Sequence, residues 1–174
     1  TLDTAFDISS KDAGSEQKLD LAPAGDALNS QAEDITFNND GTKLFAISDN
    51  GAMNIHTLST PYDISSGVTL VADDGINWRT YKQPWGSSNT IMLPQTIRFN
   101  NDGTKMYLTE AVINTSVSVG VVQYNLATPF VPSSTNSVKV LNVRAQFPAD
   151  NVAIHAMNFD DDGTRMYVLS LIHI

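Results

Sequence analysis

The sequence predicts an all-β fold built from a repeated unit of four short antiparallel strands. Two sequence signatures support this fold, and each occurs three times along the 174 residues. Both signatures combine a short apolar segment with a turn rich in Gly, Asp, Asn or Pro, which is typical of antiparallel hairpins. Segments with helical periodicity are absent, and the nearest candidate, residues 22–32, contains Pro23 and Gly25.

The first signature is a hairpin turn of the form Phe-Asn-Asn-Asp-Gly-Thr. It lies within residues 35–45, returns almost unchanged within 97–107, and occurs as Phe-Asp-Asp-Asp-Gly-Thr within 157–167. Glycine supplies the positive φ that such a turn needs, and Asp and Asn side chains accept hydrogen bonds from the nearby backbone. We therefore expect one strand before each turn and one strand after it.

The second signature lies out of phase with the first. It reads Leu-Ser-Thr-Pro-Tyr-Asp-Ile-Ser-Ser at residues 58–66, with a related copy at 2–10 and a degraded copy at 126–134. Proline presets the backbone of a turn and cannot donate to a strand ladder. Together, the two signatures predict strands at 31–37, 43–48, 53–58 and 68–72 in one unit, and at 94–99, 105–109, 119–126 and 137–143 in the next.

Tandem four-stranded antiparallel units are typical of β-propeller blades, which pack face to face around a central channel. The stretch Phe-Asn-Asn-Asp-Gly-Thr-Lys-Met-Tyr at 99–107 also resembles the turn signature of YVTN, TolB-like and WD40-like propeller repeats. This resemblance implies the architecture and leaves the activity open, because those families include enzymes, scaffolds and surface proteins. The chain departs from WD40 repeats in lacking the Trp-Asp dipeptide.

The length predicts a β-propeller fragment, because a closed ring needs roughly four to eight blades. The repeats divide the chain into the end of a blade at 1–30, blades at 31–72 and 94–143, and the start of a blade at 152–168. We expect about two complete blades and two partial ones, with the remaining blades in a longer parent chain. A homo-oligomer that closes a ring is the alternative. The last residues, 169–174, resemble a translated transposase adaptor and are expected to be non-native.

Binding residues are expected at one end of the strands. Successive turns of a meander fall at alternate ends, so both signatures share one face and the variable connections share the other. Variable loops on a rigid scaffold usually carry the binding residues. The predicted ligand-binding residues lie in the variable connection at 73–93, and they are Trp78, Arg79, Tyr81, Lys82 and Trp85. They suit a carbohydrate or protein ligand, and the alternative is that both Trp side chains cover the edges of neighbouring blades.

A second candidate site follows from aligning the three copies of the first signature. Four residues before the central Phe of each copy lie Glu33, Gln95 and His155. Because they begin the expected innermost strands, we predict that they face one axial pocket. A carboxylate, an amide and an imidazole can bind a divalent metal, and the resemblance to calcium-dependent propeller lactonases implies calcium in this region. The alternative is the polar lining of a wet channel.

Composition narrows the range of functions. The chain has 19 acidic residues against 10 Lys and Arg, so its formal net charge is -9. Nucleic-acid partners are not expected, because phosphate binding depends on basic side chains. No apolar run approaches the roughly 20 residues of a membrane-spanning helix.

Catalytic motifs are absent from the sequence. It contains no Gly-x-Ser-x-Gly elbow, no phosphate-binding Gly loop and no His-Glu-x-x-His pair. We therefore predict a non-catalytic binding or surface-display protein with no catalytic residue and no organic cofactor, and we expect an extracellular or periplasmic location. The alternative is a metal-dependent hydrolase resembling the lactonases, with most of its site in the missing blades.

Overall fold

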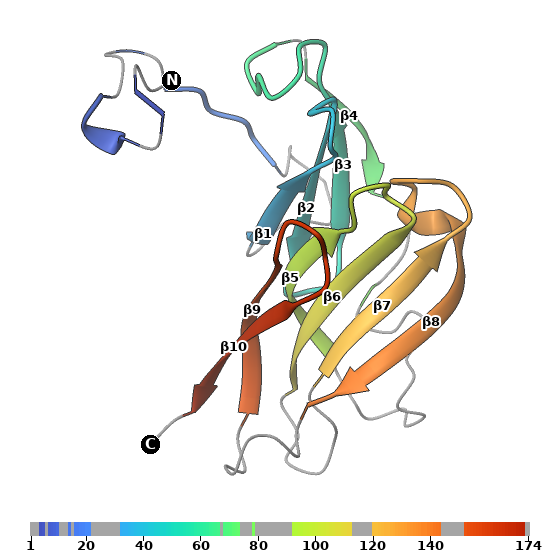
Figure 1. Ribbon diagram of the computed structural model, residues 1–174. Coiled ribbons are helices and arrows are strands. Elements are labelled where there is room, and N and C mark those ends of the chain that lie inside the picture. Colours follow the sequence, from blue (N-terminus) through green and yellow to red (C-terminus); the bar gives the residue numbers. More distant parts are fainter. Residues whose placement is uncertain are drawn as a thin grey trace.

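In the residues that it describes, the computed structural model has ten β-strands and two three-residue 3-10 helices, η1 (Ile8–Ser10) and η2 (Pro132–Ser134) (Figure 1). It describes residues 4–5, 7–10, 14, 16–21, 32–66, 68–73, 78, 92–112, 120–143 and 152–172. Within these ranges, every element longer than three residues is a strand, which confirms the predicted all-β class. None of the helices in the described part of the chain is long and apolar enough to cross a membrane.

The first unit is a four-stranded antiparallel sheet in the order β1-β2-β3-β4. Its strands are β1 (Ala32–Phe37), β2 (Lys43–Ser48), β3 (Met53–Thr57) and β4 (Thr69–Asp73). The strand bounds agree with the predicted ones to within one residue, because the two turn signatures mark most of the strand ends.

The second unit repeats this meander with β5 (Met92–Phe99), β6 (Lys105–Val112), β7 (Gly120–Leu126) and β8 (Thr135–Asn142). A third hairpin, β9 (Val152–Phe159) and β10 (Met166–Ile172), joins the same sheet through one pair, Ala111 and Ala153. Residues 169–172, expected to be non-native, continue β10 and pair with β9. Their origin stays a prediction.

The first strands of the three units lie side by side (Figure 1). The Asp34 carboxylate of β1 accepts a hydrogen bond from the Ile97 N–H of β5 at 3.0 Å and forms an ion pair with Arg98 at 2.5 Å. On the other side of β5, the Thr96 hydroxyl donates to the carbonyl of His155 in β9 at 3.2 Å. Side chains and single backbone groups therefore hold the three strands together in the order β1, β5, β9.

The main core lies between the two four-stranded sheets. It joins β2 and β3 to β5, β6 and β7 through the buried side chains Phe45, Ile47, Met53, Ile97, Met106, Leu108, Val122 and Tyr124. A smaller core lies between the second unit and the third hairpin, and it contains Val121, Val143, Ile154 and Met157. Burying each large apolar side chain stabilises the fold by about 1.5–3 kcal/mol, so face-to-face packing of the units dominates the stability.

The three Asp-Gly turns adopt the same hydrogen-bonded form. In each turn the Asp carboxylate accepts a hydrogen bond at 2.9 Å from the backbone N–H of the Thr two residues later, in the pairs Asp40 and Thr42, Asp102 and Thr104, and Asp162 and Thr164. This confirms the predicted turn chemistry. Neighbouring turns are also joined, because the Asn101 amide donates to the Asp161 carbonyl at 3.3 Å and Asn39 donates likewise to the Asn101 carbonyl.

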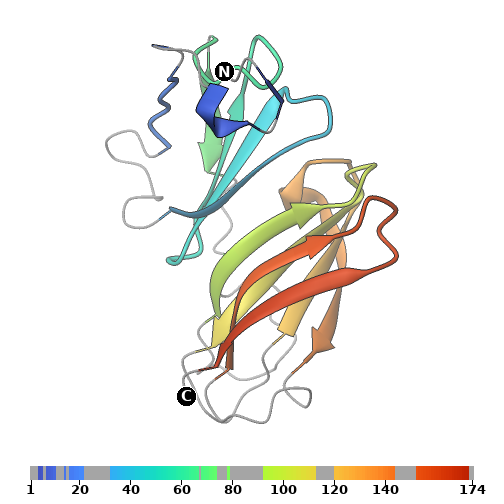
Figure 2. The ribbon, with the colours of Figure 1, turned by 60° about the vertical axis from the view of Figure 1, so that its left-hand side comes forward.

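The second signature packs against the first within each unit. In the first unit, the Leu58 N–H donates to the Thr42 carbonyl at 2.8 Å and the Tyr62 N–H to the Gly41 carbonyl at 2.9 Å. The second unit repeats both bonds at the same distances, in the pairs Leu126 and Thr104, and Phe130 and Gly103. Both signatures therefore share one end of the strands, as predicted. We call it the turn end, and Figure 2 shows the three Asp-Gly turns together on the right-hand side.

Candidate functional site

The first strand of each unit, β1, β5 and β9, contains a β-bulge at the same position. In β1 the pairing with β2 shifts between Ala32 and Asp34, so Glu33 is the extra residue. In β5 the extra residue is Gln95, and in β9 it is His155. The three residues predicted to face an axial pocket are therefore the three bulge residues.

A β-bulge changes the direction of a side chain and interrupts the strand ladder, and bulges are common next to binding and active sites. Here all three bulges lie in the N-terminal half of the strand, away from the Asp-Gly turns. We call this end of the strands the bulge end. The Glu33 and His155 side chains are exposed there, and that of Gln95 is half-buried.

Titratable side chains from separate units lie close enough at the bulge end to change the pKa of Glu33. Partial removal of water from the Glu33 carboxylate raises the pKa of this group, and the negative charge of Asp49 raises it further. His155 opposes both effects and lowers the pKa. The pKa of Glu33 therefore depends on Asp49, which follows β2 in its own unit, and on His155, which lies two units away.

The backbone around the bulges is held by the bonds between β1, β5 and β9. Asp34, which binds Ile97 and Arg98, directly follows Glu33, and Thr96 directly follows Gln95. The carbonyl that Thr96 binds belongs to His155 itself. In each of the first two units, the residue after the bulge residue therefore binds the neighbouring strand. The bulge residue itself lies at the candidate site.

The bulge residues present do not form a calcium site by themselves. Calcium takes six to eight oxygen ligands, whereas this cluster combines acidic side chains with an imidazole and an amide. Within the described ranges, no group of three or more His, Cys, Asp or Glu side chains is arranged to hold a metal ion. The expectation of a divalent metal stays a prediction, and we derive no chemistry through it.

The structure places Trp78 in the main core and not on a ligand-binding surface. Its side chain is 0% exposed and packs edge-on against Tyr124, with ring centroids 5.1 Å apart and an interplanar angle of 85°. Its backbone N–H donates to the Gly51 carbonyl at 2.8 Å. Trp78 therefore takes the structural role that was the alternative interpretation. The other four predicted ligand-binding residues, Arg79, Tyr81, Lys82 and Trp85, lie outside the described residues.

Sequence reasoning found the bulge residues but missed the bulges. The signal was Pro94, which is the first residue of the expected strand at 94–99 and lies inside the observed strand β5. Within sheets, proline is confined to edges, strand starts and bulges, and Pro94 directly precedes the bulge residue of β5. The contribution of Asp49 had no local signal, because it depends on the turn after β2 lying beside the start of β1.

The chain has no match among protein-family models, curated proteins or solved structures.

Proposed function

We propose that the chain is part of a β-propeller that binds a polar ligand at the bulge end of its innermost strands. The observation that supports this proposal is the recurrence of the bulge. Three units place a polar residue at the same irregular position, and the residue differs in each unit. A bulge kept for backbone geometry alone needs no polar side chain.

The propeller part of the proposal draws on the arrangement of the units. Propeller blades are four-stranded meanders whose first strands meet around an axis and whose faces pack on their neighbours. In this chain, β1, β5 and β9 lie side by side in sequence order, and the main core lies between the first two units.

The chemistry of the bulge residues favours a neutral or cationic ligand with several hydroxyl or amine groups. Glu33 accepts hydrogen bonds when ionised, Gln95 both donates and accepts, and His155 can do either. The nearby Asp49 adds a second negative charge, which disfavours anions. A carbohydrate fits this set best. The alternative function, a metal-dependent hydrolase, requires further acidic side chains around Glu33 from other parts of the ring.

A glycan array probed with the whole chain tests this function. We expect binding to neutral or amino sugars that Glu33→Gln weakens by about tenfold, because the variant keeps the shape and loses the charged acceptor. Asp161→Asn is the control, because it removes an exposed carboxylate from the turn end. If no glycan binds, or if the two variants weaken binding equally, the bulge end is not the binding site.

A further inference from the structure

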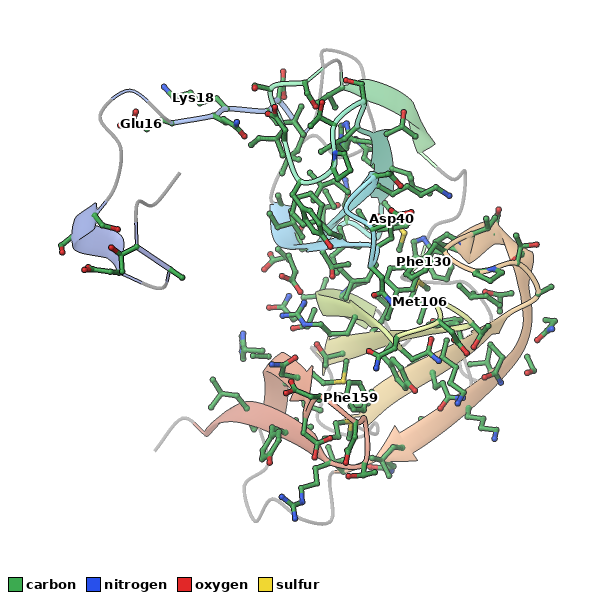
Figure 3. The ribbon with its side chains drawn as sticks, turned by 45° about the horizontal axis from the view of Figure 1, so that its top comes forward. Glu16, Lys18, Asp40, Met106, Phe130 and Phe159 are labelled. Carbon is green, nitrogen blue, oxygen red and sulfur yellow. The ribbon has the colours of Figure 1, made fainter. Side chains whose placement is uncertain are left out.

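A second set of polar residues lies at one position along β1, β5 and β9. The residue directly before the Phe of the first signature is Thr36, Arg98 or Asn158. The positions on either side are apolar in every unit, namely Ile35, Ile97 and Met157 before it and Phe37, Phe99 and Phe159 after it. Figure 3 shows Phe159 between the second sheet and the β9–β10 hairpin, where it packs against the smaller core. The polar position, like the bulge position, therefore changes its side chain from unit to unit beside constant apolar positions.

This position lies at a fixed separation from the bulge residues. In every unit it is three residues further along the strand, toward the turn end. A strand rises about 3.3 Å per residue, so the two polar positions are about 10 Å apart along the strands. We call Thr36, Arg98 and Asn158 the second polar layer. A ligand that contacts both layers must be about that long.

The Arg98 guanidinium is fixed in place by groups on β1 and β5. Its Nη1 donates to the Asp34 carboxylate at 2.5 Å and to the Ile97 carbonyl at 2.6 Å. The Asp34 carboxylate also accepts hydrogen bonds from the backbone N–H of Ile97 at 3.0 Å and from that of Ile35 at 2.9 Å. Because the carboxylate is itself held by two backbone groups, it orients the guanidinium before any ligand binds.

Most hydrogen-bond donors of Arg98 remain available. A guanidinium has five N–H groups on three nitrogens and no acceptor. Among the described residues, the Nη2 and Nε groups of Arg98 make no hydrogen bond, and the side chain is 30% exposed. Arg98 lines the same hollow as Asn158 of β9, whose exposed side chain also makes no hydrogen bond within the described ranges. The second polar layer therefore offers a fixed set of donors between β5 and β9.

The surrounding charges favour a neutral acceptor at this layer. Asp34 balances the charge of Arg98, and Glu33 and Asp49 make the bulge end negative. The whole chain has a formal net charge of -9, so an anionic ligand group gains little here. A carbonyl oxygen has two lone pairs and can accept hydrogen bonds from two donors of a guanidinium. Among neutral sugar substituents, an N-acetyl group supplies such a carbonyl.

We propose that Arg98 and Asn158 form a second subsite, which binds an N-acetyl carbonyl of a neutral oligosaccharide whose other end lies at the bulge residues. This inference rests on the proposed function and specifies its ligand class. The ligand is an N-acetylated chain of two or more sugar units, because one pyranose ring is too short to contact both layers. Arg98 then acts on specificity for chain length, whereas Glu33 acts on binding of every length.

Isothermal titration calorimetry of the whole chain with N-acetylglucosamine and its β-1,4-linked dimer, trimer and tetramer tests the second subsite. We expect the affinity to rise about tenfold between the monomer and the first oligomer that contacts both layers. Arg98→Lys keeps a positive charge beside Asp34 but lacks the planar fork, so it should reduce the ratio of oligomer to monomer affinity to near one. Arg165→Lys is the matched control at the turn end, where Lys43 and Lys105 occupy the corresponding positions. It should keep the full ratio.

Asn158→Ala provides a second variant whose effect on folding should be small, because the side chain is exposed. It should lower the same ratio with an unchanged urea midpoint. The inference is overturned if all lengths bind equally, or if the ratio survives in both Arg98→Lys and Asn158→Ala. Should Glu33→Gln weaken binding of every length while these two variants change nothing, the proposed function stands and the second subsite does not exist. If no length binds, this inference fails, and the glycan array alone decides the proposed function.

Discussion

The turn end and the bulge end of β1, β5 and β9 differ in what their polar side chains bind. At the turn end, every unit repeats Asp-Gly-Thr, and each Asp carboxylate binds its own backbone. At the bulge end, every unit repeats the backbone irregularity, but the side chain changes from Glu33 to Gln95 to His155. Side chains that are identical in every unit therefore have a structural role here. At the candidate site, the backbone geometry is repeated but the side chain changes from unit to unit.

The largest expected effect comes from Trp78→Ala. This side chain belongs to the variable connection, yet it is fully buried against Tyr124. Truncating a buried Trp costs about 3–5 kcal/mol of unfolding free energy, because a cavity remains. Urea denaturation followed by circular dichroism measures this loss, and Trp78→Phe should lose less. An unchanged midpoint for Trp78→Ala would place this residue with the solvent-facing groups of the bulge end.

Glycine substitutions compare the turn at Gly103, where the Phe130 ring lies over the glycine, with the turn at Gly163, where nothing lies within 4 Å of an added Cβ. Gly103→Ala forces a side chain into a positive φ, which costs about 1–2 kcal/mol, and also overlaps the Phe130 ring, which costs roughly 1–3 kcal/mol more. Gly163→Ala should show the backbone cost alone. Thermal melts of both variants in dilute solution measure the difference. Equal losses would mean that Phe130 yields at no cost and that covering the turn adds no stability.

The sequence predicted most of the fold because its information is local. Asp-Gly and Thr-Pro turns specify where strands end, so the strand bounds of the first unit agree with those expected to within one residue. In the second unit, β6 ends at Val112, three residues beyond the expected end at 109. The bulges were missed because a register shift depends on the partner strand. The sequence left two interpretations of Trp78 open, ligand binding and cover of neighbouring units, because burial depends on packing between two sheets. An aromatic residue in a variable loop has the same local sequence whether it lies inside or outside.

An acid titration of stability distinguishes the two ends further. Hydrogen bonds from the Thr104 hydroxyl and N–H lower the pKa of Asp102 below its ordinary value of 3.8. The folded state therefore favours the ionised carboxylate. Its stabilising contribution is present above pH 3.8 and is lost as the pH falls through the lowered pKa.

Asp102→Asn should remove this contribution and flatten the acid limb of the melting temperature plotted against pH. Asp161→Asn is the control, because it removes the same charge from the same end of the strands. If Asp102→Asn retains the full acid dependence of the unmodified chain, as Asp161→Asn should, the hydrogen bonds from Thr104 to the Asp102 carboxylate are not a source of stability.

Glu33→Gln should have the smallest effect on stability and the opposite dependence on pH. Because partial burial and Asp49 raise the pKa of Glu33 above its ordinary value of 4.5, ionising this carboxylate opposes folding. Stability therefore falls as the pH rises through the window between 4.5 and the raised pKa. The Gln variant has no carboxylate to ionise. Its free energy of unfolding should therefore equal that of the unmodified chain below this pH window and exceed it by up to about 0.5 kcal/mol above the window. Urea midpoints at pH 3.5 and pH 7 measure the change. A loss of stability at pH 7 would show that Glu33 supports the fold, as the turn carboxylates do, and would remove the main reason for assigning ligand binding to the bulge end.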